Sequence, residues 1–192
     1  MRSSRTAAAF YGFGDASGTA YGTAFQKAPK QGIPTEVYFE CGQWTPKVGS
    51  QESSNWRELT NLVEFLEGQG ATGFLNDSEV FLFTDNSTAE AAFWKGTSKS
   101  RKLLALVLRL RQLEMKTEMI LHLIHVSGTR MIQVGADGLS RGDHSTGVMA
   151  GKDMLAHIPL HKLALERSAQ FCLLYTSPSP RDLSTSRMPS SA

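Results

Sequence analysis

One apolar run that ends in a carboxylate constrains the fold of this chain more than any other stretch. Residues 79–84, EVFLFT, are rich in Val and Phe, which is typical of a buried strand. The run stops at Asp85 and Asn86, and Ser87 followed by Glu90 three residues later predicts the start of a helix. Asp85 is therefore predicted to lie at the C-terminal end of a central strand, the edge where ligands bind in open α/β sheets.

A structural role is the competing interpretation of Asp85. Asp, Asn and Ser are the preferred N-cap residues of helices, and such a cap contributes about 1 kcal/mol. Asp85, Asn86 or Ser87 could therefore simply cap the following helix. What favours a functional site is that other acidic residues occur in comparable settings: Asp15, Glu58 and Asp137.

Length and hydropathy place the chain in a broad class. Its 192 residues contain no apolar run long enough to span a membrane and no N-terminal secretion signal. We therefore expect an intracellular domain, in the cytoplasm or nucleus, with no membrane partner. The chain is long enough for one domain with a proper core.

The C-terminal segment differs in character from the rest. Residues 172–192, CLLYTSPSPRDLSTSRMPSSA, can be back-translated into DNA that resembles a transposase sequencing adapter. We expect this tail to be non-native and disordered, and the natural chain to end near Phe171. A genuine disordered Ser/Pro tail is the alternative.

Removing this tail changes the charge balance and the cysteine count. The tail holds Arg181, Arg187 and Asp182, so 20 basic and 18 acidic residues become 18 and 17, a net charge of +1. Global charge therefore says nothing about nucleic-acid binding. Cys41 remains as a single cysteine, which excludes an internal disulfide or a cysteine metal site and fits a reducing compartment.

The order of predicted elements indicates the fold class. Residues 7–16, 18–27 and 35–42 are predicted to be three strands of an antiparallel meander, and glycines within them indicate bulges or close approach of another backbone. The later elements are a loop at 43–52, a helix at 53–67, the strand at 79–84, helices at 87–95 and 98–116, a strand at 119–126, a loop at 129–135 and a helix near Asp137. This order favours a mixed α/β fold, a five-stranded sheet flanked by helices.

Acidic residues gathered at one end of such a sheet predict a cation site. Clustered carboxylates raise one another's pKa, which is costly unless cations bind there. Oxygen ligands favour Mg²⁺ or Mn²⁺, and no Cys pair or His-Glu-x-x-His spacing supports zinc. Capping remains the alternative for Glu58, as a capping-box partner of Asn55, and for Asp137, at the start of the last helix.

Four short motifs then carry a resemblance to a known family. Residues 14–18 (GDASG), 54–59 (SNWREL), 83–87 (FTDNS) and 135–141 (GADGLSR) are similar, in this order, to the motifs of the ribonuclease H domain of retrotransposon reverse-transcriptase polyproteins. The resemblance covers residues 7–141. It implies a ribonuclease H-like fold and an endonuclease that hydrolyses the RNA strand of RNA–DNA hybrids.

The resemblance also implies roles for individual residues. The catalytic and metal-binding residues would be Asp15, Glu58, Asp85 and Asp137. They would hold two Mg²⁺ ions, with Mn²⁺ as the alternative. The substrate contacts would be the backbone near Ser17 and Gly18 and the side chain of Asn86. The implied partners are an RNA–DNA hybrid and the reverse-transcriptase domain of the parent polyprotein.

One departure from the family leaves a second function open. Cellular ribonucleases H place a His after a Gly in the loop before the last carboxylate, whereas here Thr129 follows Gly128. We expect His122 and His125 to be ordinary strand residues. The alternative function is an inactive ribonuclease-H-like module that supports a polymerase and binds nucleic acid; retention of all the acids favours the nuclease.

Three regions follow from this interpretation. Residues 1–141 are predicted to form the ribonuclease H-like domain, and residues 142–171 an extension or linker, with a helical packing segment, towards a missing downstream domain. Residues 172–192 are the adapter-like tail. We expect the chain to be a fragment whose polymerase is absent. A basic cluster of Lys95, Lys99, Arg101 and Lys102 fits a phosphate backbone about as well as a solvated face.

Overall fold

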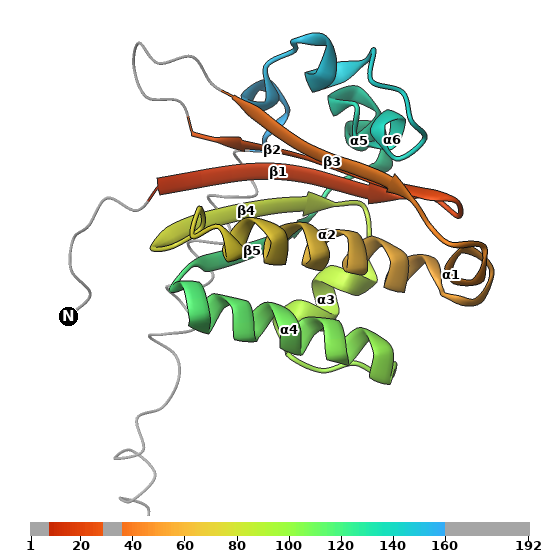
Figure 1. The fold of residues 1–192 in the computed structure, drawn as a ribbon, viewed down its shortest axis with the longest axis vertical. Coiled ribbons are helices and arrows are strands. Elements are labelled where there is room, and N and C mark those ends of the chain that lie inside the picture. The colour runs from red at the N-terminus through yellow and green to blue at the C-terminus, as the bar shows by residue number, and fades with distance from the viewer. Residues whose placement is uncertain (1–7, 29–35, 160–192) are drawn as a thin grey trace, which may run out of the picture. The chain divides into compact units, whose positions relative to one another are not determined.

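The computed structural model describes residues 8–28 and 36–159, and a mixed sheet forms its centre (Figure 1). The five strands lie in the order β3-β2-β1-β4-β5. Their bounds are β1 (Ala8–Ala16), β2 (Ala20–Lys27), β3 (Val37–Gln43), β4 (Ser78–Thr84) and β5 (Ile120–His125). The predicted α/β class, with a five-stranded mixed sheet and an antiparallel meander, is confirmed.

The directions of the strands determine which strand ends lie at the same edge of the sheet. β1, β2 and β3 pair antiparallel, with Asp15 opposite Gly22 and Gly22 opposite Cys41. β4 pairs parallel with both β1 and β5. The C-terminal ends of β1, β4 and β5 therefore share one edge of the sheet, and Asp15 and Asp85 lie at this edge, as the sequence predicts for a ligand site.

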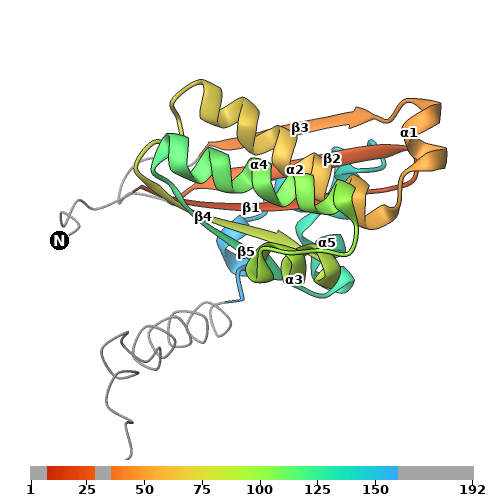
Figure 2. The same cartoon turned by 90° about the horizontal axis from the view of Figure 1, so that it is seen from below.

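Helices cover both faces of the sheet. Their bounds are α1 (Pro46–Gln51), α2 (Ser54–Ala71), α3 (Ser87–Lys95), α4 (Arg101–Thr117), α5 (Gly128–Val134) and α6 (Ala136–Leu139), followed by the 3-10 turns η1 (Gly147–Ala150) and η2 (Met154–His157). Figures 1 and 2 show α2, α3 and α4 on one face, and α5 and α6 on the other. In the part of the chain that the structure describes, none of the helices is long and apolar enough to cross a membrane.

The main core lies between the sheet and the helices α2 and α4. Alternate strand residues such as Val80 and Leu82 point to this side and are fully buried. α4 contributes residues at helical spacing, and its buried apolar positions are Leu103, Leu106, Val107, Leu110 and Leu113. Burial of such side chains stabilises the fold by about 1.5–3 kcal/mol each, so this layer holds the sheet edge in place.

Two segments predicted as loops are helices instead. The predicted loop at 43–52 contains α1, which Thr45 caps and which has Pro46 at its first turn, a position that favours Pro. The predicted loop at 129–135 is α5, which ends at Gly135 with a left-handed φ of 89°. Both helices are too short for a clear apolar period, so the sequence pattern missed them.

One predicted helix end was also wrong. α2 continues past Gly68 to Ala71, because Gly70 packs against α4: a Cβ there would lie 2.8 Å from Leu113 Cδ1. Gly70 therefore allows α2 and α4 to pack closely, and it does not form the turn that was predicted for residues 68–73.

The chain divides into a compact unit of residues 1–157 and a second unit of residues 158–192. Residues 142–157 belong to the first unit and form η1 and η2 where a helical packing segment was predicted. The boundary at residue 141 stays a prediction. The tail at 172–192 lies outside the described residues.

Candidate active site

The acidic residues singled out by sequence come from different elements. Asp15 lies near the end of β1, Asp85 directly follows β4, Glu58 lies in the second turn of α2, and Asp137 lies in α6. Their charges act on one another. Burial and then the charges of Asp85 and Asp137 raise the pKa of Asp15, and burial and then the charges of Asp85 and Asp15 raise the pKa of Glu58. The acids therefore gather near the sheet edge where β1 and β4 end.

The structure decides between capping and a free carboxylate for two of these acids. Asn86 is the N-cap of α3, and its side-chain oxygen accepts from the backbone N–H of Ala89 at 2.9 Å. Ser53 is the N-cap of α2 and accepts from Trp56 N–H at 3.3 Å. The capping interpretations of Asp85 and Glu58 are therefore wrong, and both carboxylates are available for another role.

Asp137 retains part of its structural interpretation. It lies in the first turn of α6, where negative charge is favourable. Asp137 is not the N-cap itself, because that position is Gly135, which has no side chain to cap the helix. Its carboxylate pairs with Arg141 one turn later: Nη2 lies 2.9 Å from Oδ1, and Nε lies 3.2 Å from each oxygen. Asp137 is thus the one of these acids that a cationic side chain neutralises in the described structure.

Asp15 is held in a buried, acidic environment. Asp15 is 8% exposed as a residue. Burial is the largest cause of its raised pKa, followed among the raising causes by the charges of Asp85 and Asp137. Ser140 opposes this increase, because its Oγ donates to Asp15 Oδ2 at 2.7 Å. The hydroxyl proton of Ser140 is therefore an important stabiliser of the ionised Asp15.

Glu58 has the most strongly raised pKa of the acids at this edge. Burial and then the charge of Asp85 raise its pKa to about 7, while a hydrogen bond with Asn86 lowers it. Its Oε2 is buried and has no hydrogen-bond partner among the described residues. A buried carboxylate oxygen without a donor is costly, and a cation or a bound donor would relieve the cost.

The ligand atoms at this edge suit a hard cation. All four acids offer oxygen, the ligand type that Mg²⁺ and Mn²⁺ prefer. Within residues 8–28 and 36–159, however, no three His, Cys, Asp or Glu side chains come together closely enough to form a ready-made metal cage. The residues fit such a cation by chemistry and charge, and not by a preformed geometry.

The predicted substrate contacts are largely engaged within the protein. Both Asn86 side-chain groups are used, since Nδ2 donates to Asn55 Oδ1 at 2.9 Å, and the side chain is only 6% exposed. The carbonyl of Ser17 accepts from Arg57 Nε at 3.0 Å, and the Ser17 N–H donates to Ala20 O. A Cβ added at Gly18 would meet no atom within 4 Å. A role of these residues in substrate binding stays a prediction.

Sequence reasoning missed two residues that build this edge, Ser140 and Asn61. From α2, the Asn61 amide donates to the carbonyls of Asp15 and Gly22, at 3.0 and 3.1 Å, and so ties α2 to β1 and β2. Asn61 lies on the other side of α2 from the predicted apolar stripe, so the sequence pattern did not mark it as buried. Ser140 belongs to the motif at residues 135–141, but nothing local marks its bond to Asp15, which spans 125 positions.

The expected close approach at a strand glycine is confirmed at Gly22. A Cβ on Gly22 would lie 2.8 Å from the backbone carbon of Leu139 and 2.9 Å from the backbone nitrogen of Ser140. The absence of a side chain at Gly22 therefore lets α6 lie against β2, which brings Ser140 to Asp15.

The remaining candidates occupy structural positions. His122 and His125 both lie in β5, as expected, and the ring of His122 stacks on Phe81 at 4.6 Å. In the basic cluster, Lys102 pairs with Glu52 at 2.6 Å. That ion pair offsets part of the cluster's positive charge.

Comparisons with known proteins give similarities of fold only. No protein-family model matches the chain. No curated protein matches it in sequence. Ribonuclease H1 from the archaeon Halobacterium salinarum NRC-1 is 17% identical, with 71% of this chain and 96% of that chain covered and a TM-score of 0.46. LC11-RNase H1, from compost, solved with an RNA/DNA hybrid, is 19% identical over 70% of this chain and 94% of that chain, also with a TM-score of 0.46.

A viral structure is similar at a lower level. The foamy viral protease-reverse transcriptase bound to double-stranded DNA is 13% identical over 72% of this chain and 90% of that chain, with a TM-score of 0.38. These identities are too low to speak to the chemistry of this chain.

Proposed function

We propose that this chain is a metal-dependent endonuclease that hydrolyses the RNA strand of RNA–DNA hybrids, within a retroelement reverse transcriptase. The observation that carries the proposal is electrostatic: at one sheet edge, burial and the charges of Asp85 and Asp137 raise the pKa of Asp15, and burial and the charges of Asp85 and Asp15 raise the pKa of Glu58 to about 7. Carboxylates gathered in this way are expensive for folding alone, so a function that uses cations explains them. The order of the ribonuclease H-like motifs supports the same function.

The four acids would hold two Mg²⁺ ions, with Mn²⁺ as the alternative. When bound, such cations supply the positive charge that activates a water and stabilises the leaving oxygen in a phosphoryl displacement. Water adds to phosphorus and gives up a proton, while the bond from phosphorus to the 3′ oxygen breaks. The 3′ oxygen takes up a proton, which leaves a 3′-hydroxyl and a 5′-phosphate.

The chain's own side chains prepare this arrangement. Ser140 donates to Asp15 Oδ2 and so favours the ionised form that a cation needs. Glu58 holds a proton up to about pH 7 and would release it when a cation binds. Arg141 supplies a positive charge to Asp137 until a cation replaces it.

A second candidate function rests on a specific observation. In the described ranges no three ligating side chains form a metal cage, and Asp137 is already paired with Arg141. Both facts favour an inactive module that supports the polymerase and binds nucleic acid. The partner in either case would be the reverse-transcriptase domain of the parent polyprotein.

Cleavage of a labelled RNA–DNA hybrid by the full chain, with Mg²⁺ and then Mn²⁺, tests the proposal. We expect metal-dependent cleavage that Asp85→Asn abolishes. The matched control is Asp77→Asn, because Asp77 precedes β4 at the opposite end of the strand and its left-handed φ of 54° suits Asn. A folded chain that binds the hybrid but never cleaves it would establish the inactive module instead.

A further inference from the structure

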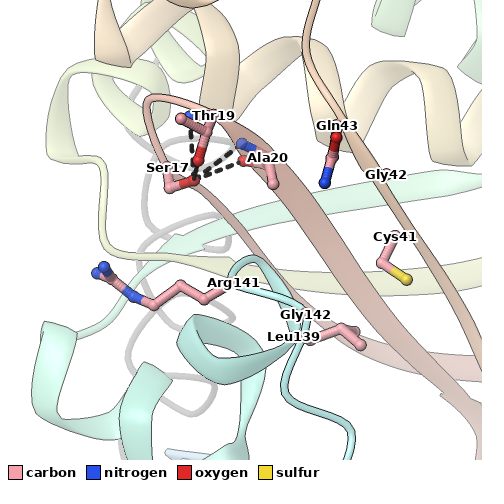
Figure 3. A pocket seen from close by; sticks show the side chains of 9 residues that line it. All are labelled: Ser17, Thr19, Ala20, Cys41, Gly42, Gln43, Leu139, Arg141 and Gly142. Carbon is pink, nitrogen blue, oxygen red and sulfur yellow. Dashed lines mark hydrogen bonds between the residues drawn. The ribbon is translucent and has the colours of Figure 1, made fainter.

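A pocket of about 340 Å³ opens beside the acidic edge (Figure 3). Three separate parts of the chain form its walls: the β1–β2 turn, the end of β3, and the segment around the end of α6. The lining residues are Ser17, Thr19, Ala20, Cys41, Gly42, Gln43, Leu139, Arg141 and Gly142. Asp15, Glu58, Asp85 and Asp137 are not among these lining residues.

The pocket is coupled to the acids through its α6 wall. Ser17 Oγ lies 3.4 Å from the carbonyl of Ser140, whose own hydroxyl contacts Asp15. Arg141, in the same wall, pairs with Asp137. In Figure 3 the Arg141 side chain extends away from β3, while Cys41 and Gln43 lie on the β3 side. A ligand in the pocket would therefore lie between Arg141 and β3, next to two of the acids.

The lining suits a sugar–phosphate unit. Arg141 is 65% exposed at its side chain, so its guanidinium can reach a phosphate as well as Asp137. Thr19 and Gln43 offer a hydroxyl and an amide, which both donate and accept hydrogen bonds. Ala20 and Leu139 add apolar surface. The volume lies at the lower end of the range for small-ligand sites, about 300–1,000 Å³, which suits one nucleotide.

We propose that this pocket binds one ribonucleotide of the RNA strand beside the cleaved bond. Arg141 binds its phosphate, and Thr19 and Gln43 contact its ribose, whose 2′-hydroxyl both donates and accepts. The inference rests on the proposed function for its substrate. It adds Arg141, Thr19 and Gln43, around a pocket that Ser17 also lines, to the substrate contacts expected from sequence at Ser17, Gly18 and Asn86.

Cys41 provides a direct probe of occupancy. It lines the pocket, it is partly exposed, and its Sγ lies 3.8 Å from His144 Nε2. In a Cys172→Ser background, alkylation of Cys41 by iodoacetamide is measured in EDTA, so that no cleavage occurs. We expect saturating RNA–DNA hybrid to slow alkylation about tenfold, and DNA duplex of the same sequence to protect much less.

Substitutions test the same pocket by affinity. Fluorescence anisotropy with labelled hybrid, again in EDTA, compares Gln43→Ala with Gln112→Ala, an exposed glutamine on α4. It also compares Arg141→Gln with Lys116→Gln, at the end of α4 that leads to the opposite sheet edge. We expect both pocket variants to bind hybrid about tenfold more weakly, and the controls to bind normally. Arg141→Gln also lowers the slope of log affinity against log salt by about one.

The outcomes separate this inference from the proposed function. Hybrid that binds tightly while Cys41 is alkylated at its full rate overturns the pocket and leaves the nuclease intact. Protection of Cys41 in a protein that never cleaves supports the pocket and overturns the nuclease. Absence of hybrid binding overturns both. Because the alkylation measurement needs no pocket substitution, a misfolded variant cannot decide the result.

Discussion

Ser140 Oγ lies 2.7 Å from Asp15 Oδ2, across 125 positions of sequence, and the Ser140 side chain is fully buried. The same hydroxyl lies 2.8 Å from the carbonyl of Asp137. A hydroxyl has a single proton, so Ser140 can donate to only one of the two at a time. An ionised Asp15 attracts that proton more strongly than a carbonyl does, and the bond thus joins β1 to α6.

Ser140→Ala should lower the stability of the fold, because it removes this hydrogen bond. The change leaves the buried Asp15 carboxylate without its side-chain donor, so we expect the free energy of unfolding to fall by about 1–3 kcal/mol. Urea denaturation at neutral pH measures the loss. Ser50→Ala is the control, since Ser50 is exposed and donates only to backbone carbonyls of its own helix. Equal stability of the two variants would contradict the role of Ser140.

Glu58 should make stability depend on pH. Its pKa rises from 4.5 to about 7 in the folded protein, so between these values the folded state holds a proton that the unfolded chain has released. The free energy of unfolding therefore falls as pH rises through this window, by about 1–2 kcal/mol once solvent screening is considered. The raised pKa of Asp15 acts in the same direction.

Denaturation in EDTA from pH 4.5 to 8 measures this effect. Glu58→Gln should flatten much of the curve, because the amide has no proton to lose. Saturating Mg²⁺ should also flatten it, since cations stabilise the ionised carboxylates. A stability that rises over this window in the unmodified chain would show that Glu58 is not in the environment described.

Arg141→Gln should change cation binding in the opposite sense to hybrid binding. The substitution frees Asp137 from its ion pair, so Mg²⁺ affinity in the absence of nucleic acid should rise about two- to fivefold, the range expected for an exposed pair. Isothermal titration with Mg²⁺ measures it, and Lys116→Gln should show no change. Weaker Mg²⁺ binding by the Arg141 variant would mean that the guanidinium supports the cation site.

The strands and the acidic residues could be predicted because their signals are local. Residues 79–84 carry a continuous apolar run, which predicts a buried strand and places Asp85 at its C-terminal end. The parallel pairing of β1 and β4 then places Asp15 and Asp85 at one edge. Periodicity also predicted α2 and α4, since each buries a long apolar stripe.

The rest depends on contacts that no local pattern encodes. α1 buries none of its residues, so no apolar period marks it, and its only signal is the capping pair Thr45 and Pro46. The role of Ser140 arises only where α6 lies against Gly22. The choice of Asn86 over Asp85 as cap is likewise a matter of geometry, since both residue types cap helices well.

Asn86 should prove to be a stabilising cap. Asn86→Ser keeps a capping oxygen for Ala89 N–H but loses the bond to Asn55, whereas Asn86→Ala loses both. We expect the alanine variant to be less stable than the serine variant by about 1 kcal/mol in urea denaturation. Asn76→Ala, at an exposed turn, should have an effect within about 0.5 kcal/mol. Equal stability of the two Asn86 variants would argue against capping.

Gly22→Ala should disturb the acidic edge without touching an acid. The new Cβ would meet backbone atoms of Leu139 and Ser140 at 2.8 and 2.9 Å, and backbone cannot rotate away as a side chain does, so α6 must move. We expect a stability loss of about 1–3 kcal/mol, as for other overpacked sites. We also expect a large loss of hybrid cleavage, because Ser140 and Asp137 move away from Asp15.

Gly18→Ala provides the matched control for this change. Gly18 lies in the β1–β2 turn, and a Cβ there meets nothing within 4 Å, so its stability should stay within about 0.5 kcal/mol of the unmodified chain. Urea denaturation compares the two alanine variants, and single-turnover cleavage of labelled hybrid compares Gly22→Ala with the unmodified chain. If Gly22→Ala matched Gly18→Ala in stability and the unmodified chain in cleavage, α6 would not need to lie so close to β2. The link from Gly22 through Ser140 to Asp15 would then be wrong.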